Sequence, residues 1–149
     1  MPSPIVRTRR FDHAGLVVAD VAASVAFYRD VLGLTIVPRP AFSFDGAWLR
    51  SGDAVIHLLE QHVGNGAAGE RIDAVEHPSR TRHLAFEVAD CREAAAALTD
   101  AGQTIVVGPK SRPDGATQAY LRDPDGYLIE LYSDPAAAEP TEPAAAESS

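Results

Sequence analysis

Four residues of the types that bind metal ions recur at matched places in this chain. The stretches "DHAGLVVAD" and "RHLAFEVAD" each carry a histidine, then alternating apolar residues, then an aspartate. Further along, "VIHLL" aligns with "LIELY", so that a histidine falls opposite a glutamate. The candidate metal ligands are therefore His13, His57, His83 and Glu130.

Strand geometry gives each of these residues a defined face. Side chains alternate along a strand, so His57 shares a face with Val55 and Leu59, and Glu130 shares one with Leu128 and Tyr132. A single strand histidine is more often packing than a ligand, but four such groups converging unpaired would cost about 1 to 3 kcal/mol each. Three imidazoles and a carboxylate suit Zn, Ni, Fe, Mn or Co better than Ca or Mg, which prefer oxygen-only shells. We therefore expect a divalent transition metal as cofactor.

The elements that must position these residues also occur twice. A strand is followed by a helix capped by Asp20 or Asp90, the helix ends at Gly33 or Gly102, and three β-rich runs follow. The predicted fold is α+β, with tandem βαβββ modules. The expected boundaries are an N-terminal arm (1–9), a domain (10–133) made of modules 11–60 and 81–132 joined by a linker (61–80), and a disordered acidic tail (134–149).

Length and charge narrow the classes of partner. At 149 residues and 46% hydrophobic content, the chain can form one buried core. Half of the formal net charge of −8 lies in the tail, which has one Asp, three Glu and no Lys or Arg after Tyr132. The chain has no basic stripe beyond Arg7, Arg9 and Arg10, so nucleic acid is not an expected partner. The chain lacks the run of about 20 apolar residues that a membrane span needs. We expect a soluble, cytoplasmic protein with a small-molecule substrate.

With both modules placed, the chain resembles the vicinal oxygen chelate superfamily. That superfamily includes glyoxalase I, methylmalonyl-CoA epimerase, extradiol dioxygenases, fosfomycin-resistance thiol transferases and bleomycin-binding proteins. The likeness covers residues 10–133 and rests on "FDHAGLVVAD", "SVAFYRDVLGL", "HLAFEVAD" and "RDPDGYLIELY". It further extends to "RPAFSFDGAWLRSGDAVIHLLEQ", which is similar to a glyoxalase-like subgroup.

The resemblance implies a fold, a ligand set and a chemical strategy. Two βαβββ modules would form an open, incomplete β-barrel around a metal held at His13, His57, His83 and Glu130. The ion would chelate two neighbouring oxygens of a substrate and stabilise the anion formed there. The resemblance also implies a homodimer, because superfamily members usually cover their exposed sheet surface with a partner.

The resemblance to glyoxalase I has one departure. Glyoxalase I has a carboxylate, and the epimerase pattern a glutamine, where this chain has His57. A lyase or isomerase of this type needs a base that moves a proton between adjacent carbons, and Glu130 is the only carboxylate in the set. The first hypothesis is therefore a metal-dependent, glyoxalase-like lyase or isomerase, with Glu130 as catalytic base, acting on a vicinal-oxygen substrate or its thiol adduct.

Two alternatives remain open at this stage. One is a non-haem Fe(II) extradiol-type dioxygenase that uses His13, His83 and Glu130 as its metal-binding triad. A fosfomycin-type transferase would use the same three ligands. His57 argues against both, because it would occupy a coordination position that they need free. The other is a non-catalytic, bleomycin-resistance-like binding protein with an apolar groove lined by residues such as Phe44, Trp48 and Tyr120.

Overall fold

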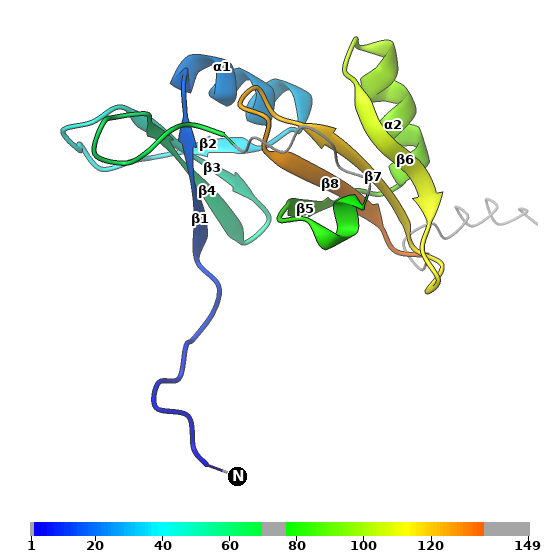
Figure 1. Cartoon of the computed structure of the whole chain (residues 1–149), viewed down its shortest axis with the longest axis horizontal. Helices are drawn as coiled ribbons and strands as arrows, with labels where there is room; N and C mark the ends of the chain where they lie inside the picture. The colour runs from blue at the N-terminus through cyan, green and yellow to red at the C-terminus, as the bar shows by residue number, and fades with distance from the viewer. Residues whose placement is uncertain (1, 70–76, 136–149) are drawn as a thin grey trace, which may run out of the picture. The chain divides into compact units, whose positions relative to one another are not determined.

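The computed structural model describes residues 2–69 and 77–135 of the chain. It divides into two compact units, Met1–Glu70 and Arg71–Ser149. The described part of each unit contains a four-stranded mixed sheet and one α-helix, so the fold is α+β, as the sequence predicts (Figure 1).

The first unit has the strand order β1-β4-β3-β2. Strands β1 and β4 are parallel, whereas the pairs β3/β4 and β2/β3 are antiparallel. A short π-helical turn continues the helix into the loop before β2. The elements are β1 (His13–Val18), α1 (Val21–Ala26), the π-helical turn (Phe27–Val31), β2 (Thr35–Val37), β3 (Gly46–Ser51) and β4 (Ala54–Glu60).

The second unit repeats this topology with the order β5-β8-β7-β6. Its first and last strands, β5 and β8, are again parallel, and β7 is antiparallel to both of its neighbours. Helix α2 contacts β6, β7 and β8. The elements are a 3₁₀ turn (Pro78–Arg80), β5 (Leu84–Glu87), α2 (Cys91–Asp100), β6 (Ile105–Ser111), β7 (Thr117–Arg122) and β8 (Leu128–Ser133).

The two helices begin where the sequence predicts. The Asp20 carboxylate accepts a hydrogen bond from the main-chain N–H of Ala23 at 3.1 Å, and the Asp90 carboxylate accepts two, from Arg92 at 2.9 Å and Glu93 at 3.1 Å. These are N-caps, each of which typically stabilises a helix by about 1 kcal/mol. Each cap lies shortly after the first strand of its unit, which ends at Val18 or Glu87, so the helix begins close to the end of that strand.

One sheet face in the first unit is buried against the helix, and the other carries the candidate ligands. Helix α1 contacts β3 and β4, and Leu49, Ile56 and Leu58 are buried on these strands. His57 lies between Ile56 and Leu58, so its side chain points to the opposite, half-buried face. The alternation of the sheet thus separates the core from the site.

The strands start and end at slightly different residues than the sequence indicates. Strand β1 begins at His13 rather than Phe11, whose side chain is 75% exposed, and the strand predicted from Thr81 begins at Leu84. Both histidines of the repeat therefore stand at or just before the start of their strands, where the chain enters the sheet. No helix within the described ranges is long and apolar enough to cross a membrane.

Candidate metal-ligand site

In the first unit, the parallel pairing of β1 and β4 brings His13 and His57 together. Gly15 is the register partner of His57, so His13, two residues earlier on the same face, lies beside it. Their rings stack with centroids 3.8 Å apart and an interplanar angle of 13°. The two histidines therefore form a parallel imidazole pair on one sheet face.

The protonation of His13 is set by its neighbour in the chain. Nδ1 of His13 donates a hydrogen bond to Oδ2 of Asp12 at 2.7 Å, and Nη2 of Arg10 donates to Oδ1 of Asp12 at 3.0 Å. The hydrogen bond from His13 lowers the pKa of Asp12, with a smaller contribution from the charge of Arg10. Asp12 is thus an ionised acceptor for Nδ1–H, which leaves the Nε2 lone pair of His13 available to a metal.

His57 is held neutral by its surroundings. Burial lowers its pKa most, the charges of His13 and Arg39 lower it further, and the charge of Asp12 opposes them. Its ring lies between His13 and Trp48, with a centroid distance of 4.1 Å and an angle of 3° to Trp48. A neutral imidazole with a fixed ring plane is the form that binds transition metals.

In the second unit, β5 and β8 bring His83 and Glu130 together in the same way. Ala85 is the register partner of Glu130, and His83 lies two residues before Ala85. Nε2 of His83 is 3.0 Å from Oε2 of Glu130, and the two side chains are 22% and 7% exposed. This pair is the more deeply buried of the two.

The hydrogen bond at Nδ1 of His83 determines which atom of its ring faces Glu130 without a proton in the neutral form. Nδ1 of His83 is 2.6 Å from the main-chain oxygen of Thr81, which can only accept, so Nδ1 must carry a proton. In the neutral ring, Nε2 would then direct a lone pair at a carboxylate oxygen 3.0 Å away. Two acceptors at this distance repel, and the repulsion is removed by an added proton, on Nε2 or on the carboxyl oxygen, or by a cation bound to both groups. The donor set at this pair therefore fits a metal ion.

Tyr120 adds a hydrogen-bond donor to the second pair. It is the register partner of Glu130 on β7, its hydroxyl donates to Oε1 of Gln118 at 3.3 Å, and its ring meets His83 edge to face at 5.7 Å. Burial raises its pKa to about 12, with further contributions from the charge of Glu130 and a hydrogen bond to it. Tyr120 is therefore a neutral phenol at any physiological pH.

The structure brings the candidate ligands together as one pair in each module and adds residues that the sequence analysis did not assign to the site. Among residues 2–69 and 77–135, His, Cys, Asp and Glu form no group of three or more that could hold a metal, so the ligand candidates occur as two pairs, one per unit. Asp12 and the carbonyl of Thr81 were missed as acceptors for the histidines. Trp48 and Tyr120 were assigned only to an apolar groove, although each is the register partner of the last-strand ligand in its module.

The two histidines outside the repeat, His62 and His77, lie at the surface. His62 is exposed, and its Nδ1 accepts a hydrogen bond from the main-chain N–H of Gly64 at 3.0 Å. His77 is exposed and precedes the 3₁₀ turn. Neither is part of a ligand pair.

With this geometry established, comparison with known proteins gives the family. Residues 10–131 match the Glyoxalase/Bleomycin resistance protein/Dioxygenase superfamily, and the chain belongs to it. It is similar to the lactoylglutathione lyase of Haemophilus influenzae, with 29% identity over 80% of this chain and 88% of that protein. It is also similar to the glutathione transferase FosA of Serratia marcescens, with 33% identity over 81% of this chain and 78% of the relative.

A solved structure supports the same assignment. The crystal structure of a virulence protein from Salmonella typhimurium aligns with a TM-score of 0.63 and 28% identity, covering 86% of this chain and 98% of that one. The fold and the family are thereby shown, and relatives at about 30% identity with a lyase name and a transferase name leave the reaction to be proposed.

Proposed function

We propose that this protein is a metal-dependent lyase or isomerase of the glyoxalase I type, acting on a small vicinal-oxygen substrate or its thiol adduct. Its divalent transition metal, Zn, Ni, Fe, Mn or Co, would be held by the imidazole pair of the first unit and the imidazole–carboxylate pair of the second: His13, His57, His83 and Glu130. The observation that carries the proposal is the buried contact between His83 and Glu130, in which two acceptor atoms face each other at 3.0 Å and require a cation or an added proton.

Each pair supports metal binding in its own way. Asp12 orients His13 so that its Nε2 lone pair is free, and burial keeps His57 neutral at low cost. Glu130 supplies the one negative charge of the four-ligand set, and this charge would partly neutralise a divalent ion beside a carboxylate that is 7% exposed. A bound ion would polarise two neighbouring substrate oxygens and stabilise the anion that forms when a proton leaves the adjacent carbon.

Glu130 is the proposed base. It is the carboxylate of the set, so a carboxylate oxygen of Glu130 would accept the substrate proton and return it to the neighbouring carbon. Tyr120 is the register partner of Glu130 and stays protonated, because its pKa is raised to about 12. Its single hydroxyl proton is donated to Gln118 in this structure and would have to turn to Glu130 to hold that carboxylate in position during the proton transfer.

We also propose that the protein works as a cytoplasmic homodimer. Each sheet has two edge strands, β1 and β2 in one and β5 and β6 in the other, and such edges are commonly covered by a partner. The ligand pairs of one metal could then belong to one chain or to two. Light scattering of the purified protein at micromolar concentration tests this, and a clean monomer would reject it.

The test of the proposed reaction compares two variants, Glu130→Gln and His57→Gln. Protein purified without chelator should contain about one divalent metal ion per chain. Glu130→Gln should abolish exchange of a substrate C–H proton into deuterated water while retaining more of its metal than of its turnover. His57→Gln keeps a metal donor, removes no proton acceptor, and should be the milder change.

The outcome separates this proposal from the alternatives. Wild-type turnover without C–H exchange, or a fully metallated Glu130→Gln protein that remains fast, would reject the isomerase. Oxygen consumption with Fe(II) and a catechol would favour the extradiol dioxygenase. Addition of a thiol to fosfomycin would favour the transferase. Metal-free protein that binds a drug without converting it would favour the bleomycin-resistance-like binder.

A further inference from the structure

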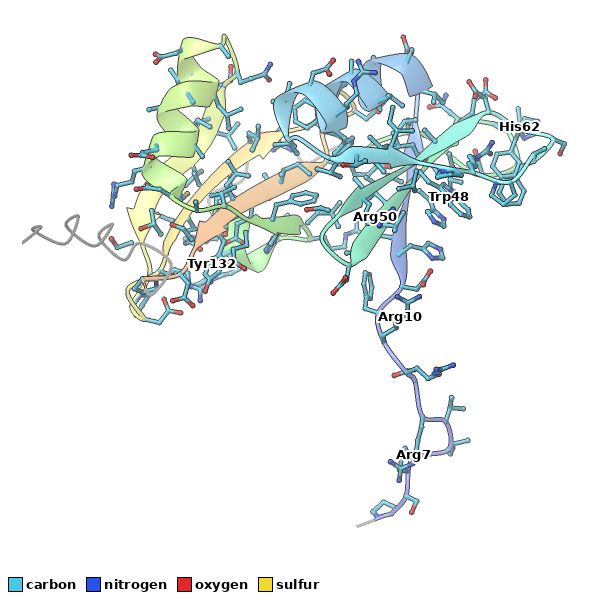
Figure 2. All side chains as sticks on the ribbon, turned by 180° about the vertical axis from the view of Figure 1, so that it is seen from behind. Arg7, Arg10, Trp48, Arg50, His62 and Tyr132 are labelled. Carbon is cyan, nitrogen blue, oxygen red and sulfur yellow. The ribbon has the colours of Figure 1, made fainter. Side chains whose placement is uncertain are left out.

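A row of aromatic rings extends from the imidazole pair of the first unit into the loop between β2 and β3. Trp48, on β3, stacks on His57 with centroids 4.1 Å apart. Phe42 follows at 6.2 Å from Trp48, and Phe44 at 5.3 Å from Phe42 with an interplanar angle of 22°. We call Phe42, Phe44 and Trp48 the aromatic shelf. Figure 2 shows Trp48 and Arg50 on the strand that carries the start of this row.

The outer end of the aromatic shelf is exposed. Phe42 is 46% exposed and Phe44 is 44% exposed, and they lie next to each other. A single exposed phenylalanine needs no explanation, but adjacent ones that continue a stacked row mark a binding surface. Flat aromatic faces offer large contact area to another planar group.

The shelf is held in place before any ligand binds. Nη2 of Arg39 donates a hydrogen bond to the main-chain oxygen of Phe44 at 2.8 Å. The guanidinium carbon lies 4.8 Å from the ring centre of Phe42 and 4.9 Å from that of Phe44. Gly46 permits this packing, because a Cβ there would lie 3.1 Å from Nη2 of Arg39 and 2.4 Å from the main-chain oxygen of Leu58. The loop conformation is therefore set by Arg39 and the sheet.

Arg39 has hydrogen-bonding capacity that the described residues do not use. Its buried Nε has no hydrogen-bond partner in the described part of the chain, and its one recorded acceptor there is the carbonyl of Phe44. Within those same residues no carboxylate pairs with it. A guanidinium offers five donors and pairs preferentially with carboxylates, so this cation is incompletely satisfied.

We propose that Arg39 and the aromatic shelf bind an aryl carboxylate, with the aromatic ring of the ligand packed on Phe42 and Trp48 and its carboxylate accepting from the guanidinium group of Arg39. The ring row then leads from this subsite to His57, so an aryl carboxylate group would be the part of the substrate held away from the reacting oxygens. The link to the reaction rests on the proposed function, but binding at the subsite does not require the metal.

Trp48 makes the proposal directly measurable, because it is the only tryptophan in the chain. Its fluorescence in the full-length protein is titrated with 4-nitrobenzoate and with the neutral isostere 4-nitrobenzamide, before and after treatment with a chelator. We expect saturable quenching by both, and about tenfold tighter binding of the carboxylate, as one charge-assisted hydrogen bond commonly provides. The preference should persist after the metal is removed.

Two variants with matched controls test whether Arg39 provides the preference for the carboxylate and whether Phe42 contributes to binding of the ring. Arg39→Gln should bring the affinity for 4-nitrobenzoate down to that for 4-nitrobenzamide, whereas Arg7→Gln, which removes the same charge from the exposed N-terminal segment, should leave both affinities unchanged. Phe42→Leu should weaken both ligands about equally, and Phe11→Leu, at another exposed phenylalanine, should weaken neither. Figure 2 shows Arg7 and Arg10 on the segment that precedes β1.

The outcomes distinguish this inference from the proposed reaction. Quenching by wild-type protein that does not saturate, or equal affinities for the two ligands, overturns the subsite without any variant having to fold. Retention of the carboxylate preference in Arg39→Gln overturns the role of Arg39. A protein that binds 4-nitrobenzoate as expected but lacks metal and C–H exchange would keep the subsite and reject the lyase or isomerase.

Discussion

The two units have the same topology and the same pairing of first and last strands, but different chemistry at corresponding positions. In both, the first strand approaches the last strand in parallel, and the two ligand candidates share one face. In the first unit two imidazoles stack, and the side chain of His13 is 44% exposed. In the second unit an imidazole faces a carboxylate, and Glu130 is 7% exposed. The repeat therefore positions the ligands, while burial and side-chain type assign charge to one pair only.

The neighbouring aromatic residues differ in the same way. Trp48 and Tyr120 are register partners of His57 and Glu130. Trp48 lies flat on its imidazole, whereas Tyr120 meets His83 at 85° and carries a hydroxyl beside the carboxylate. The indole of Trp48 extends the imidazole pair toward the aromatic shelf, whereas the phenol of Tyr120 stands beside the carboxylate that we propose as the base. We expect the first unit to determine ligand choice and the second to determine reactivity.

The largest expected effect comes from removing one pair at a time. The double variant His83→Ala/Glu130→Ala should lower metal affinity by about a thousandfold, equivalent to about 4 kcal/mol. It removes the only negative charge among the four proposed ligands and the more deeply buried pair of metal-binding atoms. The double variant His13→Ala/His57→Ala should lower it by about a hundredfold. Competition with a chromophoric chelator measures both, with circular dichroism as a check on folding. An equal or reversed order would show that the negative charge does not dominate.

A smaller effect is expected from the acceptors behind the histidines. Asp12→Ala removes the carboxylate that fixes the proton of His13 on Nδ1, so metal affinity should fall by about 10- to 100-fold. Thr81→Ala is the matched control in the other unit, because the acceptor for His83 is the main-chain oxygen, which alanine retains. Loss of affinity in Thr81→Ala as large as in Asp12→Ala would contradict this interpretation. Isothermal titration with the identified metal gives both values.

Tyr120→Phe should have a modest effect that depends on pH. In the folded protein the pKa of Tyr120 is raised from 10.0 to about 12, so the unfolded chain releases this proton first. The stability that the neutral phenol contributes is complete below pH 10 and is lost as pH rises from there to about 12. Urea unfolding should show a loss of about 1 kcal/mol in Tyr120→Phe at pH 7, from the hydrogen bond to Gln118, and a flatter decline above pH 10.

Trp48→Phe serves as the comparison for that measurement. It alters the register partner of the other pair without removing a titratable group, so the alkaline decline should remain that of the wild-type protein. If the alkaline decline in the free energy of unfolding were also flatter in Trp48→Phe, the decline would not be caused by ionisation of Tyr120.

The smallest expected effect is that of removing residues 136–149. These lie outside the described residues, as does most of the tail that the sequence predicts to be disordered. Asp134 accepts a hydrogen bond from the hydroxyl of Tyr132 at 3.1 Å, so truncation should come after Pro135. Melting temperature and metal content should then match the full-length protein. A lower value of either would show that the tail contributes to one of the units.

Much of the fold could be predicted because it depends on local signals. The alternation of apolar residues predicted the strands. Asp20 and Asp90 predicted the starts of the two helices, where their carboxylates accept hydrogen bonds from main-chain N–H groups. Strand alternation also placed His57 opposite the core face correctly. These features need only the neighbours of each residue in the chain.

The rest depends on which residues meet across strands. The stacking of Trp48 on His57 and the contact of Tyr120 with His83 follow from register, which the sequence repeat alone does not specify for the third strand of each module. The acceptor for His83 is a main-chain carbonyl that no residue type reveals. Asp12 was available as a signal, since it precedes His13 directly, whereas the position of Arg39 over the two phenylalanine rings required the loop conformation.

The turn between β7 and β8 has a consequence for how this protein can vary. One carboxylate oxygen of Asp123 accepts the main-chain N–H groups of Asp125 and Tyr127, and its carbonyl accepts that of Gly126, which has a φ of 88°. One residue gained or lost there would shift β8 by one position and present Ile129 or Leu131 where Glu130 now stands. Length changes at this turn should therefore be eliminated by selection even though it lies outside the site.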